Sequence, residues 1–187
     1  NNLQLTLDIE LQEITEQAFG DRKGALVAID PTTGGILALV STPTYDPNLF
    51  VDGITPDNWK DLNEDPSKPM VNRAINGAYP PGSTFKPFMA LGALELGKRT
   101  PNQSISDPGY YNFGNHTFRD DKKGGHGSVD MYKSIVHSCD TYYYMLANDM
   151  GIDNIARFMG SLGLGQRTGV DLGKDDSGES KGVLPSQ

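Results

Sequence analysis

The segment of residues 83–96 constrains the fold more strongly than any other part of this chain. Almost all of its side chains are apolar or small, and Gly97 follows as a helix stop. A helix that is apolar on nearly every side is buried inside a domain. The sequence therefore predicts a buried central helix that begins near Ser83. Pro87 is compatible with it, because the first turn has no intrahelical N–H partner to lose.

Other segments carry the signals of a mixed fold. A turn signal at residues 30–35 separates two short apolar runs, which predicts a β-hairpin over residues 25–40 that is covered on both faces. Residues 100–128 are rich in Gly, Asp, Asn and aromatics, and we expect them to be irregular. No linker divides the chain, and the expected fold class is α/β (α+β). The other predicted elements are a strand at 3–7, helices at 8–19, 130–137, 141–150 and 153–162, and a short helix after Thr55.

Charge and cysteine usage exclude several classes of protein. The chain has 16 Lys and Arg against 24 Asp and Glu, a net charge of −8, whereas a nucleic-acid binder needs a basic surface. No apolar run approaches the roughly 20 residues of a membrane-spanning helix. Cys139 is the only cysteine, so an internal disulfide is excluded. We expect a globular protein with one core and no nucleic-acid partner.

Ser83 and Lys86 are the first candidates for chemistry. A Ser at a helix start and a Lys three residues later lie on one helix face. A serine hydroxyl needs a base within hydrogen-bond reach, and a lysine is such a base only where burial or a neighbouring cation lowers its pKa. The apolar helix offers that burial, and its N-terminal N–H groups can steady an oxyanion. The alternative interpretation is an N-cap serine followed by a surface lysine.

A second short motif, Ser138-Cys139-Asp140, lies 55 positions after Ser83 (138 − 83). It interrupts two predicted helices, and a Ser and an Asp two residues apart in such a loop can point the same way. The alternative interpretation is a helix end followed by an Asp N-cap, with a small buried cysteine between them.

These two motifs carry a resemblance to class B penicillin-binding proteins. The nucleophile motif of that family resembles Tyr79-Pro80-Pro81-Gly82-Ser83-Thr84-Phe85-Lys86-Pro87, and its second motif resembles Ser138-Cys139-Asp140, with Asp where many members have Asn. Residues 41–54, 71–74 and 149–153 are similar to the elongation-specific branch of the family, found in rod-shaped Gram-negative bacteria. The resemblance runs over essentially the whole chain.

The resemblance implies a peptidoglycan D,D-transpeptidase that forms an acyl-enzyme. Ser83 would attack the penultimate D-Ala carbonyl of a D-Ala-D-Ala stem peptide, and an amine of a neighbouring stem would then take the acyl group. Lys86 would deprotonate Ser83, Ser138 would relay a proton, and Asp140 would hydrogen-bond the lysine or the substrate. β-Lactam antibiotics would acylate Ser83. Catalysis would need no cofactor.

The resemblance also implies a location and partners. It places the protein at the periplasmic face of the bacterial inner membrane, with the anchor and the pedestal domain outside this chain. The implied partners are the RodA glycan polymerase, elongation-complex proteins such as MreC, and the remainder of the transpeptidase domain.

One part of the family pattern does not match. The third motif, Lys-Thr-Gly or Lys-Ser-Gly, is not found, since Lys174 precedes Asp175 and Lys181 precedes Gly182. We therefore expect residues 1–187 to be the first part of the transpeptidase domain and to be inactive alone. The family fold, the one shared with serine β-lactamases, is a central five-stranded antiparallel sheet packed by helices. The hairpin would supply two of the strands.

Two alternative functions share the Ser-x-x-Lys motif. A serine β-lactamase hydrolyses the acyl-enzyme and needs an additional base, for which the irregular loop offers no clear candidate. A β-lactam-sensing receptor domain is acylated without turnover. Release of penicilloic acid would indicate the lactamase.

Finally, the segment between the two motifs contains the residue types of a metal site. We predict a structural zinc ion held by four side chains, with His116 or Asp121 as possible replacements. The region has few aliphatic side chains, and a metal would compensate for that. Because Cys139 lies between Ser138 and Asp140, a metal bound to it would fix the second motif on the side away from the substrate. The four predicted ligands are Asp107, Asp120, His126 and Cys139.

Overall fold

The structure is a computed structural model that describes residues 3–172 and 178–185, so Lys174 lies outside the described residues. The chain forms two compact units. We call residues 1–78 with 172–180 the hairpin unit, and residues 79–171 with 181–187 the helical unit.

The hairpin unit is built on β1 (Gly24–Ile29) and β2 (Ile36–Thr42), which pair antiparallel as predicted. Helix α1 (Ile9–Phe19) begins at Asp8, whose side chain accepts a hydrogen bond from Leu11 N–H, and ends at Gly20. The Gln12 side-chain amide exchanges two hydrogen bonds with the backbone of Leu39, at 2.8 and 3.0 Å. This contact covers backbone groups on the free edge of β2.

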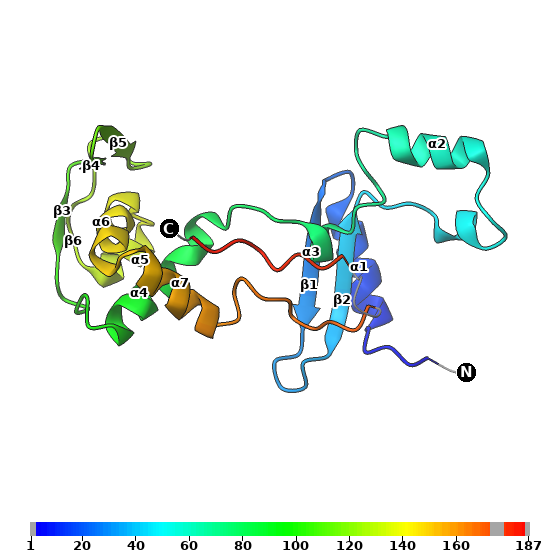
Figure 1. The fold of residues 1–187 in the computed structure, drawn as a ribbon, viewed down its shortest axis with the longest axis horizontal. Coiled ribbons are helices and arrows are strands. Elements are labelled where there is room, and N and C mark those ends of the chain that lie inside the picture. The colour runs from blue at the N-terminus through cyan, green and yellow to red at the C-terminus, as the bar shows by residue number, and fades with distance from the viewer. Residues whose placement is uncertain (1–2, 173–177, 186–187) are drawn as a thin grey trace. The chain divides into compact units, whose positions relative to one another are not determined.

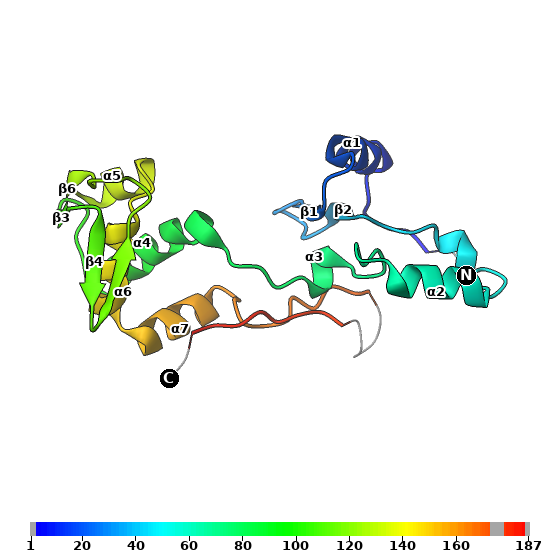
Figure 2. The same cartoon turned by 90° about the horizontal axis from the view of Figure 1, so that it is seen from above.

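Coverage of this hairpin is less complete than the sequence predicts. Figure 2 shows α1 and the single-turn helix α3 (Arg73–Asn76) on opposite faces of the two strands. Leu26, Val27 and Ile29 of β1 nevertheless remain 39–56% exposed, so the two helices leave part of this strand uncovered. The predicted strand at 3–7 is wrong, since that segment joins no sheet and Leu3 is 84% exposed.

The rest of the hairpin unit is a connection between β2 and α3 (Figure 1). It contains the 3-10 turn η1 (Pro47–Phe50) and α2 (Pro56–Glu64). Thr55 caps α2 as predicted, by accepting a hydrogen bond from Asn58 N–H.

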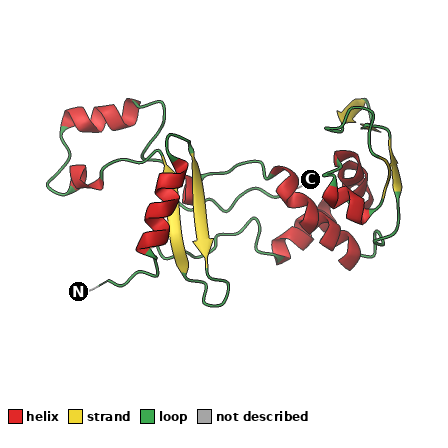
Figure 3. Ribbon diagram, turned by 180° about the vertical axis from the view of Figure 1, so that it is seen from behind, coloured by secondary structure: helices red, strands yellow, loops and turns green. Residues whose placement is uncertain are grey.

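The helical unit packs its helices around one core, and Figure 3 shows these helices next to one another. They are α4 (Lys86–Glu95), α5 (Met131–Val136), α6 (Asp140–Met150) and α7 (Ile152–Ser161). Helix α4 contacts the other three, as expected of a central helix. The predicted burial on nearly every side is wrong, because Phe88, Leu91 and Leu94 remain 41–50% exposed along one face. The close approach of α4 to α7 needs Gly92, where an added Cβ would lie 2.8 Å from the Phe158 ring. Fully buried side chains of the core are Ala93, Val129, Cys139, Tyr142, Leu146, Met150 and Met159.

Short strands, rather than irregular chain, occupy much of residues 100–128. Strand β3 (Ile105–Asp107) pairs with β6 (Gly127–Val129), and β4 (Tyr110–Phe113) pairs with β5 (His116–Arg119), both antiparallel. A hairpin signal was present, because Gly114-Asn115 between two aromatic runs is a two-residue turn. Across the described residues, every helix is too short or too polar to cross a bilayer.

Candidate active site and metal centre

The nucleophile lies on a tight turn that leads into α4. Residues Gly82–Phe85 form the 3-10 turn η2, and α4 begins at Lys86. The sequence predicted a single helix from Ser83 with Lys86 inside it. Pro87 explains the difference, because its ring would clash with the carbonyl of Ser83 if the α-helix extended that far back. Lys86 is buried as predicted, with 9% of its surface exposed.

The second motif lies at the junction of α5 and α6. Ser138 has a φ of 53°, which is unusual for a residue with a side chain and costs about 1–2 kcal/mol. Cys139 precedes α6 as its N-cap residue, and Asp140 is the first residue of that helix. The predicted Asp140 N-cap is thus displaced by one position. The turn directs the Ser138 side chain toward Ser83.

Four polar side chains form one hydrogen-bonded chain across these two segments. The Ser138 hydroxyl donates to Ser83 Oγ at 2.8 Å. Lys86 Nζ donates to Ser138 Oγ at 3.0 Å, to the Ser138 carbonyl at 2.5 Å and to Asp140 Oδ1 at 2.5 Å. The structure therefore brings together all four predicted catalytic residues, and we call them the catalytic cluster.

Within the catalytic cluster, Ser138 stands between the lysine and the nucleophile. The sequence prediction had Lys86 acting on Ser83 directly, whereas the hydrogen bonds of its Nζ go to Ser138 and Asp140. Lys86 Nζ therefore has three acceptors within hydrogen-bond distance, as many as an ammonium has N–H groups. The Tyr143 ring lies 5.6 Å from Nζ and adds a cation–π contact.

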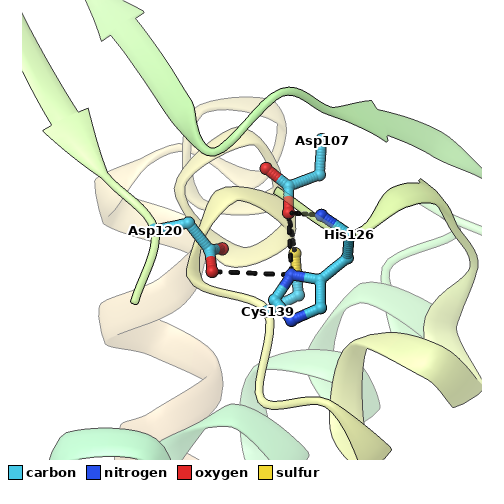
Figure 4. Close-up of side chains that lie close together, drawn as sticks. All are labelled: Asp107, Asp120, His126 and Cys139. Atoms are coloured by element: carbon cyan, nitrogen blue, oxygen red, sulfur yellow. Dashed lines mark hydrogen bonds and ion pairs between the residues drawn. The ribbon is translucent and has the colours of Figure 1, made fainter. Parts of the chain in front are cut away.

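Four further side chains lie close together, and we call them the buried cluster (Figure 4). Asp107 ends β3, Asp120 follows β5, His126 precedes β6 and Cys139 precedes α6. One ligand atom from each residue lies within 4.8 Å of the others. These are the four predicted zinc ligands, so the structure brings the whole predicted set together.

Charge is concentrated in the buried cluster. Both carboxylate side chains have 0% exposure, and His126 Nδ1 lies 2.8 Å from Asp107 and 3.5 Å from Asp120. Burial raises the pKa of each carboxyl, but hydrogen bonds from Thr141 and from further backbone N–H groups outweigh it and hold both pKa values below their usual range. Two buried negative charges therefore face one imidazole, an arrangement that calls for a cation.

The same two carboxylates also affect the pKa of the Cys139 thiol. Burial, together with the neighbouring carboxylates, raises its pKa to about 12, and Sγ lies 3.4 Å from Asp107 Oδ2. A neutral thiol donates to that oxygen. A divalent cation would reverse this preference, because thiolate is the form that binds a metal.

Two glycines allow the buried cluster to close. A Cβ on Gly125 would lie 2.2 Å from the Asp107 carbonyl oxygen, and one on Gly109 would lie 2.8 Å from Gly125 N. Both residues have positive φ, 76° and 93°. This backbone contact places His126 N–H 2.8 Å from Asp107 Oδ2.

The possible replacement ligands lie elsewhere. His116 is exposed on β5 and packs its ring on Phe118, with centroids 4.5 Å apart. Asp121 is exposed and belongs instead to a polar cavity beside Ser83, together with Lys122 and His137. Three predicted catalytic residues, Ser83, Ser138 and Asp140, line this cavity, but the sequence did not predict that Asp121 and Lys122 lie beside them.

Comparison with known proteins gives consistent matches. Residues 24–187 match the family model described as penicillin binding protein transpeptidase domain. A relative from Acinetobacter baumannii, named peptidoglycan D,D-transpeptidase MrdA, is 50% identical over 100% of this chain and 27% of its own length. The crystal structure of Pseudomonas aeruginosa PBP2 in complex with WCK 5153 matches with a TM-score of 0.90 and 44% identity, over 97% of this chain and 41% of that one.

A further solved structure is the complex between PBP2 and MreC from Helicobacter pylori. It matches with a TM-score of 0.85 and 38% identity, over 89% of this chain and 32% of that one. These matches confirm the predicted fold class. The chain spans 27% of the length of the A. baumannii relative.

Proposed function

Because this chain belongs to the penicillin-binding protein transpeptidase family, we propose that it carries the nucleophile of a peptidoglycan D,D-transpeptidase, with Ser83 as the acylated residue. The observation that supports this most strongly is the hydrogen-bonded chain from Ser83 through Ser138 to Lys86. It supplies a nucleophile, a relay and a base within hydrogen-bond distance of one another.

Acylation moves protons along these hydrogen-bonded side chains from Ser83 toward Lys86. In the structure Lys86 donates to Ser138 and Ser138 donates to Ser83, so both hydrogen bonds must reverse, with Lys86 in its neutral form, before acylation. When Ser83 Oγ attacks the carbonyl of the penultimate D-Ala, its proton then passes to Ser138 and a proton from Ser138 passes to Lys86. The proton then returns to the departing D-Ala nitrogen as the C–N bond breaks. Asp140 stabilises the protonated lysine between these two transfers. The η2 turn at the head of α4 supplies N–H groups near the developing oxyanion.

Transfer to the acceptor reverses these steps. A neutral amine of a second stem peptide attacks the Ser83 ester, the C–Oγ bond breaks, and one amine proton returns to Ser83 through Ser138. A β-lactam acylates the same oxygen because its amide resembles the D-Ala-D-Ala bond. The proposed reaction takes place at the periplasmic face of the inner membrane, where D-Ala-D-Ala stems are exposed.

We extend the proposal to partners of this machinery. The H. pylori relative was solved in complex with MreC, and this supports an elongation-complex protein of that kind as a partner. The resemblance adds a RodA-type glycan polymerase, which would supply the strands to be cross-linked. The remainder of the transpeptidase domain would contribute the substrate carboxylate site.

Cross-linking by the full-length protein tests the function. Supplied with lipid-linked peptidoglycan and a glycan polymerase, it is expected to form cross-linked dimers of stem peptides and to release D-Ala. Ser83→Ala should give uncross-linked glycan only, and Ser104→Ala should behave as wild type. Stoichiometric acylation by penicillin without cross-links would support a β-lactam receptor. Continuous release of penicilloic acid would support a β-lactamase.

We also propose that the buried cluster holds a structural zinc ion. Asp107, Asp120, His126 and Cys139 supply the donor atoms that zinc takes in sets of four. The positive charge would stabilise two buried carboxylates and a thiolate, and would hold Cys139 in place between Ser138 and Asp140. We propose a structural role rather than Lewis-acid catalysis, because Asp107, Asp120 and Cys139 are buried and only His126 reaches the cavity beside Ser83.

Metal content and thermal unfolding test this proposal. Protein purified without added zinc is expected to carry close to one equivalent, and a chelator should lower the melting temperature. Cys139→Ser should lose both the metal and the effect of the chelator. Absence of metal near stoichiometry, or full thermal stability of the variant, would show that the buried cluster works without zinc.

A further inference from the structure

A polar cavity of about 270 Å³ opens beside the nucleophile within the helical unit. Every side chain that lines it is polar or charged. It touches Ser83, Ser138 and Asp140 on one side, and on the other it meets the loop between β5 and β6. The lining residues are Ser83, Asp121, Lys122, His126, His137, Ser138 and Asp140.

Asp121 and Lys122 are the two charged residues of this cavity that belong to neither cluster. Both are exposed, and among the described residues neither side chain takes part in an ion pair or side-chain hydrogen bond. Asp140, by contrast, is held by Lys86 at 2.5 Å. The cavity therefore offers a substrate one available negative charge and one available positive charge, on adjacent residues.

The backbone that carries these two charges is fixed by the buried cluster. Asp120 Oδ1 accepts a hydrogen bond from Lys122 N–H at 3.0 Å, and the Lys122 carbonyl accepts one from Gly125 N–H at 2.9 Å. His126 and His137 stack with ring centroids 5.5 Å apart between this loop and Ser138. The two charges are thus presented to Ser83 from an anchored turn.

We propose that Asp121 and Lys122 bind the acceptor in the second half of the reaction, and that they select an amine with a carboxylate on the same carbon. An amino-acid end of this kind carries the two charges that complement an adjacent carboxylate and ammonium. The proposal rests on the proposed function, because it assumes a Ser83 acyl-enzyme.

The position of the cavity favours the acceptor over the acyl donor. It is lined by Ser83 and Ser138 together, so a group bound there lies beside both the ester carbon and the proton relay. Lys122 would hold the acceptor carboxylate, and Asp121 would draw in the ammonium. Once that ammonium has lost one proton to solvent, the neutral amine attacks, a C–N bond forms, the C–Oγ bond breaks and a second amine proton reaches Ser83.

The partition of the acyl-enzyme between two acceptors and water tests the proposal. The full-length protein is acylated with a peptidyl thioester and then offered D-alanine or D-alaninamide, which differ in the free carboxylate. The transfer-to-hydrolysis ratio is measured for each acceptor, and it does not depend on how fast the acyl-enzyme forms. Comparing variants with wild type cancels the different basicity of the two amines.

We expect wild type to favour D-alanine and Lys122→Gln to reduce that preference about tenfold, as loss of one charge-assisted contact does. Asp121→Asn should lower transfer to both acceptors, and Lys123→Gln, the adjacent exposed lysine outside the cavity, should match wild type. If Lys122→Gln keeps the preference of wild type, the acceptor assignment is wrong although the enzyme is acylated. If wild type forms no acyl-enzyme, the proposed function fails, and the acceptor assignment fails with it.

Discussion

The catalytic cluster and the buried cluster meet at three consecutive residues, yet they are built in different ways. The catalytic cluster takes its four side chains from two short motifs, and Asp140 within it has a side chain that is 28% exposed. The buried cluster takes its four from four separate points of the chain, and its carboxylates are fully buried. A reacting side chain must be accessible to substrate, whereas holding Ser138 in position requires a rigid surrounding. The turn at residues 138–140 contributes to both, with Ser138 and Asp140 in the catalytic cluster and Cys139 in the buried cluster.

Lys86→Ala tests the catalytic cluster and should have the largest effect on the rate of acylation. Removing the base should slow acylation of Ser83 by penicillin about 1000-fold, while circular dichroism shows a folded protein. Lys98→Ala, at an exposed position after α4, is the matched control. An unchanged acylation rate in the Lys86 variant would remove this residue from the mechanism.

Two variants of Ser138 separate the contribution of its hydroxyl from that of its strained backbone. Ser138→Ala and Ser138→Gly both remove the relay between Lys86 and Ser83, and both should slow acylation about 100-fold. Gly accepts the φ of 53° without strain, so its variant should be about 1 kcal/mol more stable than the Ala variant. Rates that differ greatly between the two variants would mean that the backbone, and not the hydroxyl, determines acylation.

A pair of glycine variants tests the close backbone packing in the buried cluster. Gly124 and Gly125 both have positive φ, but an added Cβ meets free space at Gly124 and the Asp107 carbonyl at Gly125. Gly125→Ala should therefore lose about 2 kcal/mol more than Gly124→Ala in the free energy of unfolding, measured by urea titration. Equal losses would contradict the close backbone contact that joins Asp107 to His126.

The smallest expected effect concerns a carboxylate in solvent. Asp30 accepts hydrogen bonds from Thr32 N–H and the Thr33 hydroxyl, and these lower its pKa from 3.8. Because the folded pKa is the lower one, the stabilisation is complete above pH 3.8 and is lost as the pH falls through the folded value. The stability difference between wild type and Asp30→Asn should shrink between pH 7 and pH 3. A constant difference would mean that this turn does not depend on the charge.

The two clusters also differ in how far the sequence predicts them. Ser83 and Lys86 lie three residues apart, so local spacing alone places them on one face. The predicted start at Ser83 is wrong, because Pro87 moves the start of the α-helix to Lys86. Ser138 links Lys86 to Ser83 because its φ is 53°, and this backbone conformation cannot be predicted from a serine in the sequence.

Residue types alone indicated the buried cluster. Asp107, His126 and Cys139 match no standard zinc spacing, and they meet because Gly125 touches the backbone of Asp107. Such a long-range contact is invisible to spacing rules. Strands β4 and β5 could have been found, because the Gly114-Asn115 turn stands between two runs of aromatic and β-branched residues.

The central claim is that Ser83 is the residue that becomes acylated, and mass spectrometry of the penicillin-treated full-length protein tests it most directly. Digestion should yield the peptide containing Ser83 with the added mass of one penicillin, and Ser83→Ala should yield no adduct. An adduct on another residue, or an unmodified Ser83 in a folded protein, would contradict the account.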